Sequence, residues 1–221
     1  MTSTPSSLTF PRIHLHEGDL PADHGMTGDL AVDTETTGLH PVFTRLCLVQ
    51  LRARDGDIHL VRIGAKQTKA PILKKLLEDR KTIKIFHYAR ADIGFLQQHL
   101  GINCQPLFCT KMASKLARTN IERHGLKDTL RDLFSIDVSK YQQQTDWSVT
   151  TLTEEQKHYA ASDVLHLHAL KDKMVELLTR EERMDIAQKC FDFLPVRAQL
   201  DRSGWYDMDI FAHGKGHYAR D

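Results

Sequence analysis

Four carboxylates and one phenol fall in three separate stretches of this chain. Asp33 and Glu35 lie in LAVDTETTGL, Asp92 in IFHYARADIGFL, and Tyr159 and Asp163 in YAASDVLHL. Acidic side chains beside apolar runs are costly unless a positive charge offsets them, and a pair of divalent metal ions would do so. Two such ions, held roughly 3.5–4 Å apart, activate a water and stabilise a leaving oxygen. The pattern therefore predicts metal-dependent hydrolysis of a phosphodiester.

The elements expected around these residues would bring them together. Asp33 and the glutamate two positions later end an apolar segment, and side chains two apart in a strand share a face. Tyr159 and Asp163 are four apart, so on a helix they point to one side. Apolar residues recur every three or four positions over 152–182, and we expect one long helix there, opened by Thr153 as its N-cap. That apolar stripe would pack on the sheet and place the tyrosine and aspartate over the strand.

The expected roles of these side chains follow from their chemistry. Mg²⁺ and Mn²⁺ prefer oxygen ligands. We assign Asp33 to both metal ions, Glu35 and Asp163 mainly to the ion that holds the attacking water, and Asp92 to the other ion through water. A phenol titrates near pH ~10, so Tyr159 is a poor general base and is expected to orient the water by a hydrogen bond. Each residue alone also has an ordinary structural explanation; their joint occurrence favours the site.

The order of the remaining elements indicates the fold class. A chain of 221 residues is long enough for one well-buried domain. Strands come first and are then interleaved with helices, which predicts an α/β layer domain with a mixed sheet covered by helices. We expect strands over 12–20, 29–35, 45–53, 57–63, 82–88 and 106–110, and further helices over 70–79, 90–100, 110–119 and 125–134. The domain limits expected are a flexible arm over 1–11, a catalytic domain over 12–182, and a C-terminal helix and tail over 183–221.

Composition limits the partners that the chain could bind. Its 30 Lys and Arg and 29 Asp and Glu residues give a net charge of +1, whereas proteins that follow a long polyanion carry a marked basic excess. This balance favours a short nucleic acid held by few phosphates. No apolar stretch has membrane-spanning length, and the opening MTSTPSSLTFPR has no hydrophobic signal core, so we expect a cytoplasmic protein without a membrane partner. The four cysteines form no C-x-x-C pair and are expected to be reduced thiols.

The three stretches resemble the motifs of the DEDD superfamily of 3′–5′ exonucleases, in the tyrosine-bearing branch that includes ribonuclease D. DTETTGL, HYARADIGFL and the Y-x-x-x-D of YAASDV match in that order, and HGLKDTLRDLFSIDVSKYQQQTDW also resembles ribonuclease D. A tyrosine four residues before the last aspartate, instead of a histidine five before it, distinguishes this branch from that of oligoribonuclease. The resemblance covers residues 12–180 and implies a ribonuclease H-like, DnaQ-like single domain that uses Mg²⁺ or Mn²⁺ and releases 5′-mononucleotides.

A narrower resemblance concerns the region after the exonuclease domain. Ribonuclease D carries further helical nucleic-acid-binding domains there, whereas this chain has the tail KCFDFLPVRAQLDRSGWYDMDIFAH. In this tail, and in FCTKMASKLART and ERHGLK, the chain is similar to nano-RNase C. That bacterial family degrades the last dinucleotides of RNA and cyclic-di-GMP turnover and assembles into octameric rings. The resemblance implies a short RNA substrate, dinucleotides above all, and a homo-oligomer in which the tail serves oligomerisation.

The same resemblance implies further substrate contacts. Thr36 and Thr37 are expected near the terminal nucleotide, whose 3′-hydroxyl Glu35 would contact. Leu39 fits the position of an apolar wedge between the last two bases, with a core leucine as an equally weighted alternative. His87 either contacts substrate or merely finishes a strand, and we favour the second explanation slightly.

Other assignments stay open. Trp205, Tyr206 and Phe211 of the tail would stack on a base, pack on their own domain or anchor a subunit interface, and we favour the interface. For the whole chain, the alternatives are a broader exonuclease acting on longer RNA 3′ ends or on DNA, and a nucleic-acid-binding module that has lost catalysis. Loss of one acid would favour the module, and none is missing.

Overall fold

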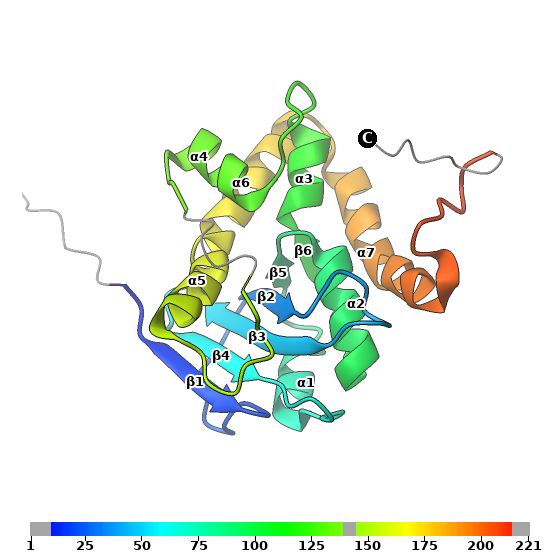
Figure 1. Cartoon of the computed structure of the whole chain (residues 1–221). Helices are drawn as coiled ribbons and strands as arrows, with labels where there is room; N and C mark the ends of the chain where they lie inside the picture. Colours follow the sequence, from blue (N-terminus) through cyan, green and yellow to red (C-terminus); the bar gives the residue numbers. More distant parts are fainter. Residues whose placement is uncertain (1–9, 139–144, 214–221) are drawn as a thin grey trace, which may run out of the picture.

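A mixed β-sheet forms the centre of the structure (Figure 1). The computed structural model describes residues 10–138 and 145–213, and within them the sheet has six strands in the order β1-β4-β3-β2-β5-β6. Strand β3 pairs antiparallel with β2 and β4, and the other pairings are parallel. The strands are β1 (Ile13–Glu17), β2 (Leu30–Thr36), β3 (Leu46–Ala53), β4 (Ile58–Arg62), β5 (Lys84–Phe86) and β6 (Leu107–Cys109). The expected α/β layer fold with a mixed sheet is confirmed.

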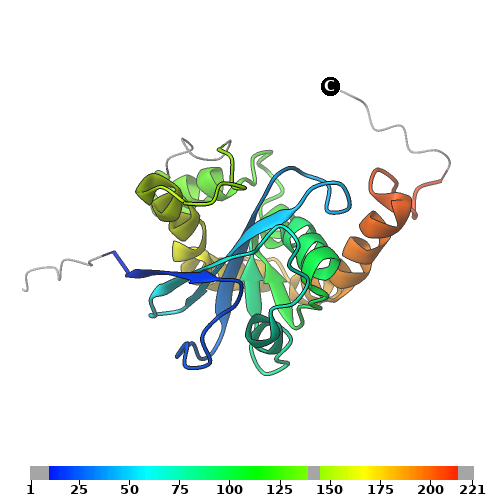
Figure 2. The same cartoon turned by 60° about the horizontal axis from the view of Figure 1, so that its bottom comes forward.

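Helices cover both faces of this sheet (Figure 2). Helix α5 lies across β1 to β4 on one side, α2 packs on β2, β3 and β5 on the other, and α7 packs against α2 and β6. The helices are α1 (Pro71–Leu77), α2 (Ala89–Leu100), α3 (Thr110–Ala117), α4 (Leu126–Phe134), α5 (Glu154–Leu165), α6 (Leu167–Arg180) and α7 (Met184–Leu200). No helix within the described ranges combines the length and the apolar composition needed to cross a bilayer.

Local sequence signals fix several of these boundaries. Thr153 caps α5: its hydroxyl accepts from the Gln156 backbone N–H, and the Gln156 side chain accepts from the Thr153 N–H. Gly101 ends α2 in the left-handed conformation, with φ of +62°. The turn between β3 and β4 closes through a hydrogen bond from Gly56 N to Ala53 O, of 3.2 Å. The N-cap at Thr153 expected from the sequence is therefore confirmed.

The prediction of a single long helix over residues 152–182 is wrong. The chain breaks at His166, which has φ of −109° and ψ of 0°, so α5 and α6 are separate helices. Two distant contacts stabilise the break: Arg52 donates to the Leu165 carbonyl at 2.9 Å, and the His168 ring lies 3.0 Å from the Asp29 carbonyl. Because the helix bends there, α5 follows β1 to β4 while α6 runs towards β5.

The C-terminal helix packs into the same core as the sheet. Phe191 of α7 is fully buried and its ring lies 4.7 Å from that of Phe108 in β6. Beyond α7, Asp201 is buried between two arginines, with its carboxylate 2.6 Å from Arg90 of α2 and 2.8 Å from Arg197. The part of residues 183–221 that the structure describes is thus attached to α2. Residues 1–9 of the expected arm lie outside the described residues, and the oligomerisation role of the tail stays a prediction.

Candidate active site

Three carboxylates meet where α5 crosses the end of β2. Oxygens of Asp33, Glu35 and Asp163 all lie within 4.8 Å of one another. The pleat of β2 turns Asp33 and Glu35 to the same face, and α5 places Asp163 over that face. Tyr159, one helical turn before Asp163, lines the same cavity. The structure therefore brings together the groups that the sequence predicted for two distant segments.

The fourth carboxylate reaches this cavity from the opposite layer. Asp92 lies in the first turn of α2 and is 5% exposed. Thr34, between Asp33 and Glu35 in β2, faces away from them, and its hydroxyl donates to Asp92 Oδ1 at 2.7 Å. This hydrogen bond fixes α2 relative to the strand, so that Asp92 also lines the cavity. No feature of the sequence pattern predicted this role for Thr34.

The loop after β2 presents Leu39 at the rim of the cavity. The pairing register with β3 shifts between Glu35 and Thr36, and such a bulge redirects the chain. The Thr36 hydroxyl then donates to the Gly38 carbonyl at 2.7 Å, and Thr37 Oγ accepts from Arg45 N at 3.0 Å. Leu39 is 84% exposed, which excludes the core alternative. Thr36 and Leu39 line the cavity, whereas Thr37 is not among its lining residues.

His87 borders the cavity, but its ring is held by the protein. Nδ1 lies 2.9 Å from the Thr110 hydroxyl and Nε2 lies 3.0 Å from the His124 carbonyl. Burial, with the nearby Lys111 charge, lowers the pKa of His87 to about 3, so the ring is neutral at physiological pH. Strand β5 ends at Phe86, the residue before His87. It does not extend to Tyr88 as expected, because Tyr88 adopts a left-handed conformation with φ of +77°.

Lys111 is a site residue that the sequence interpretation missed. Among the residues that line this cavity it is the single lysine or arginine. Its Nζ lies 4.2 Å from the centre of the Tyr88 ring, and burial followed by the neighbouring Lys115 lowers the pKa of Lys111. The position of Lys111 just after β6, at the same end of the sheet as β2 and β5, was the available signal.

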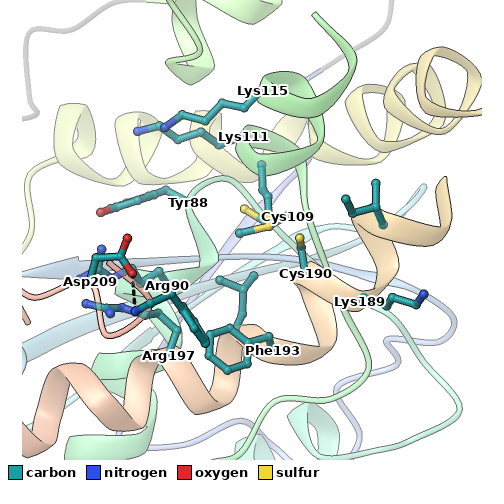
Figure 3. A pocket seen from close by; sticks show the side chains of 14 residues that line it. Tyr88, Arg90, Cys109, Lys111, Lys115, Lys189, Cys190, Phe193, Arg197 and Asp209 are labelled. Carbon is teal, nitrogen blue, oxygen red and sulfur yellow. Dashed lines mark hydrogen bonds between the residues drawn. The ribbon is translucent and has the colours of Figure 1, made fainter. Parts of the chain in front are cut away.

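A second hollow continues from the first. It has a volume of about 520 Å³, and Tyr88 and Lys111 line both cavities. Figure 3 shows Lys111 and Lys115 side by side near Tyr88, with Phe193 of α7 at the apolar side of the hollow. The acidic cavity is thus bordered by a larger surface that is mainly apolar and carries a basic edge.

Burial of the carboxylates, followed by their crowding, dominates the electrostatics of the site. Burial, followed by the charges of Asp92, Asp163 and Glu35, raises the pKa of Asp33 well above its usual range. Burial and the neighbouring acids raise the pKa of Glu35 to about 9 and of Asp163 to about 7. Burial also raises the pKa of Asp92 to about 7, against the lowering effect of the Thr34 hydrogen bond. Without added positive charge the site therefore retains protons at neutral pH.

The Tyr159 phenol stays protonated at neutral pH and can donate a hydrogen bond. Burial and then the charges of Asp163, Glu35 and Asp33 raise the pKa of its phenol. The ring packs 6.1 Å from the ring of Trp147, which limits its orientation. The phenol can thus donate a hydrogen bond to a water in the cavity, and it cannot serve as a base near pH 7.

The donor set fits a hard divalent cation. Asp33, Glu35 and Asp163 offer only oxygen atoms, which Mg²⁺ and Mn²⁺ prefer, and their mutual repulsion is what a cation would relieve. Asp92 lines the same cavity, where it could hold a second ion through water. When bound, such ions lower the pKa of a water and stabilise charge on a leaving oxygen.

The raised pKa values predict how the stability of the metal-free protein depends on pH. Protonated carboxyls are favoured in the folded state, so their stabilising contribution is present below pH ~4 and is lost as pH rises through about 9. Asp33→Asn removes one charge from the cluster. We expect this variant, in EDTA at pH 8.5, to melt a few degrees above the wild type, since about 1 kcal/mol shifts the Tm of a domain of this size by about 2–4 °C.

Thermal unfolding followed by circular dichroism from pH 5 to 9 checks this prediction. The difference in Tm should shrink towards pH 5. Glu154→Gln, at an exposed position of the same helix as Asp163, serves as the control and should leave the pH dependence unchanged. A Tm of Asp33→Asn equal to or below that of the wild type at pH 8.5 would contradict the electrostatic account.

Comparison with known proteins agrees with this geometry. Residues 19–179 match the sequence profile of a 3′–5′ exonuclease family. A ribonuclease D from Gluconacetobacter diazotrophicus is 32% identical over 156 residues, which cover 71% of this chain and 39% of that protein. The chain therefore spans well under half the length of this relative.

Solved structures give a fuller match. NrnC from Brucella melitensis bound to pGG is 47% identical, with a TM-score of 0.88 over 92% of this chain and 100% of that chain. The structure of Brucella melitensis NrnC with bound Mg²⁺ is 46% identical, with a TM-score of 0.87 over the same shares. From the matched profile, the identity and this coverage we conclude that the chain belongs to the 3′–5′ exonuclease family, in the ribonuclease D-like group that includes NrnC.

Proposed function

We propose that this chain is a metal-dependent 3′–5′ exoribonuclease that hydrolyses very short RNA, dinucleotides above all. The observation that carries the proposal is the convergence of Asp33, Glu35, Asp92, Tyr159 and Asp163 on one cavity of about 360 Å³. A water attacks the terminal phosphorus, the bond from phosphorus to the 3′ oxygen of the preceding nucleotide breaks, and that oxygen takes up a proton. The product is a 5′-mononucleotide.

The side chains around the cavity have different roles in the proposed reaction. Tyr159 donates a hydrogen bond that orients the attacking water, because its phenol stays protonated. Glu35 accepts from the 3′-hydroxyl of the terminal nucleotide, with Thr36 beside it. Leu39, apolar and 84% exposed at the rim, inserts between the last two bases. Thr37 supports this loop through its hydrogen bond with Arg45.

Charge supports a short substrate. Lys111 is the one lysine or arginine among the residues that line the catalytic cavity, and the whole chain carries a net charge of +1. A dinucleotide offers few phosphates and needs no long basic stripe. The similarity to NrnC bound to pGG supports the same substrate class. Such an activity would act in the cytoplasm on the last fragments of RNA and of cyclic-di-GMP turnover, with Mg²⁺ or Mn²⁺ as its cofactor.

We also propose that the chain works as a homo-oligomer, an octameric ring, in which the tail forms a subunit interface. Phe211 is 76% exposed and Trp205 is 41% exposed, and large exposed apolar side chains beside a hollow are typical of interfaces. Tyr206 instead packs on its own chain, with its ring 4.4 Å from that of His40 and its hydroxyl 3.3 Å from the Leu39 carbonyl. An interface at the tail would therefore lie close to the loop that carries Leu39.

Two alternative functions have to be distinguished from the proposed one. A broader exonuclease acting on longer RNA 3′ ends or on DNA would use the same five side chains, so substrate length has to be measured. A non-catalytic binding module is disfavoured, because a module without chemistry has no need for four carboxylates that repel one another.

Substrate length distinguishes the proposed function from a general exonuclease. 5′-labelled RNAs of two to about ten nucleotides are incubated with Mg²⁺, Mn²⁺ or EDTA, and products are followed over time. We expect dinucleotides to be cleaved far faster than longer RNA, and EDTA to stop cleavage. Asp33→Ala should lower the rate at least about a thousandfold, whereas Glu154→Gln should not. Equal shortening of all lengths would refute the substrate class, and an active Asp33→Ala enzyme would refute the site.

Tyr159→Phe tests the role of the phenol. We expect kcat for a dinucleotide to fall by at least about tenfold, because the attacking water loses an orienting hydrogen bond. KM should change by less than about twofold, because the ring and its packing against Trp147 are kept. Steady-state kinetics at saturating Mg²⁺ measures both constants. A rise in KM at unchanged kcat would show that the tyrosine binds substrate instead.

A further inference from the structure

Three histidines are gathered on the two strands at one edge of the sheet, β1 and β4 (Figure 1). His14 and His16 are two apart in β1 and so share a face, and the pairing register places His59 of β4 opposite His14. The His59 ring lies between the other two, with its centre 5.2 Å from each. Strand β3 separates β4 from β2, which carries Asp33 and Glu35, so this cluster and the exonuclease site are built on different parts of the sheet.

The ring nitrogens of this cluster face one another and a carboxylate. His16 Nε2 lies 3.0 Å from His59 Nδ1, and His14 Nε2 lies 2.9 Å from Asp57 Oδ2. The three rings and Asp57 line a surface hollow of about 340 Å³, together with His24. Arg12, whose side chain is 83% exposed, approaches Asp57 at 3.3 Å. Four imidazoles and two carboxylates, those of Asp23 and Asp57, thus border one small concavity.

One pair of ring nitrogens in this cluster has nearly the spacing found in a nitrogen-donor metal site. Two imidazole nitrogens bound to one tetrahedral Zn²⁺ at about 2.0–2.1 Å are separated by about 3.3 Å, close to the 3.0 Å between His16 and His59. Only neutral imidazole binds a metal. Burial lowers the pKa of His59 to about 4 and also lowers that of His16, so both rings are neutral at pH 7.

A third ligand is within reach. The His14 side chain is 42% exposed, so its ring has room to turn towards the other two from its place beside Asp57. Alternatively, Asp57 holds one His14 nitrogen while the other binds, the carboxylate–histidine pairing common around metal ligands. The pairing of β1 with β4 fixes the positions of the three Cα atoms, and closing the site requires the rings to turn about their side-chain bonds.

We propose that His14, His16 and His59 form a second metal site, which binds a transition metal ion such as Zn²⁺ and links the edge strand β1 to β4. Its donors are imidazole nitrogens, whereas those of the exonuclease site are carboxylate oxygens. The two sites therefore select different ions: imidazole suits Zn²⁺, Ni²⁺ and Cu²⁺, and carboxylate suits Mg²⁺ and Mn²⁺. The site is structural, because it stabilises an edge strand that has a partner on one side only.

Calorimetric titration with Zn²⁺ and Ni²⁺ tests the proposal. The protein is stripped with EDTA, and Asp33→Asn is combined with Asp163→Asn to weaken binding at the carboxylate cluster. We expect one Zn²⁺ per chain, undiminished by millimolar Mg²⁺. The double substitution His16→Ala and His59→Ala should weaken binding at least tenfold. His158→Ala, at an exposed histidine of α5, should leave it unchanged.

A second measurement guards against misfolding of the variants. Circular dichroism at 25 °C confirms the fold of each, and in the carboxylate-substituted background Zn²⁺ should raise the Tm of the protein with all its histidines and of His158→Ala but not that of the double histidine variant. For activity, the wild type and the same histidine variants are made without the carboxylate substitutions. Dinucleotide hydrolysis with Mg²⁺ should be the same in all three, which separates this site from the proposed function. Absence of Zn²⁺ binding in the carboxylate-substituted background, or binding that survives loss of His16 and His59, would overturn the proposal.

Discussion

Mutual repulsion among buried carboxylates is the constraint on which the rest of this structure depends. Asp33, Glu35 and Asp163 converge within 4.8 Å, and each has its pKa raised by burial and by its neighbours. Such a cluster lowers the stability of the fold at neutral pH unless positive charge is added. The packing of the sheet, of α2 and of α5 must hold the cluster together. A hard divalent cation in the cavity would relieve the same repulsion.

The helices and strands around the site hold its acidic side chains in position. The pleat of β2 turns two acids to one face, and Thr34 on the other face ties Asp92 of α2 to the same strand through a 2.7 Å hydrogen bond. The break at His166 lets α5 lie across the strands while α6 turns away. The bulge after Glu35 directs the loop outward, so that Leu39 is exposed at the rim. Rigid packing thus surrounds an opening that substrate can enter.

Signals that lie within a few residues of one another could be interpreted from the sequence alone. The D-x-E pair, the Y-x-x-x-D spacing and the Thr153 capping box each depend on one strand or one helix turn, and the structure agrees with all three. The break at His166 could not be foreseen, because Arg52 stabilises it from 113 residues away. Lys111 follows β6 at the end of the sheet where β2 also ends, and this position was its sequence signal; the packing of α3 beside Tyr88 then shows that the lysine borders the cavity.

Proton release on metal binding tests the central claim most directly. Titration of Mn²⁺ into EDTA-stripped protein at pH 7.0, in buffers of different ionisation enthalpy, gives the number of protons released per ion bound. Because burial and the neighbouring acids raise the pKa of Glu35 to about 9, metal binding at this pH must displace a proton, and we expect a net release of about one or more per chain. In the Asp33→Asn variant the release should decrease. Tight Mn²⁺ binding without proton release would contradict this account of the site.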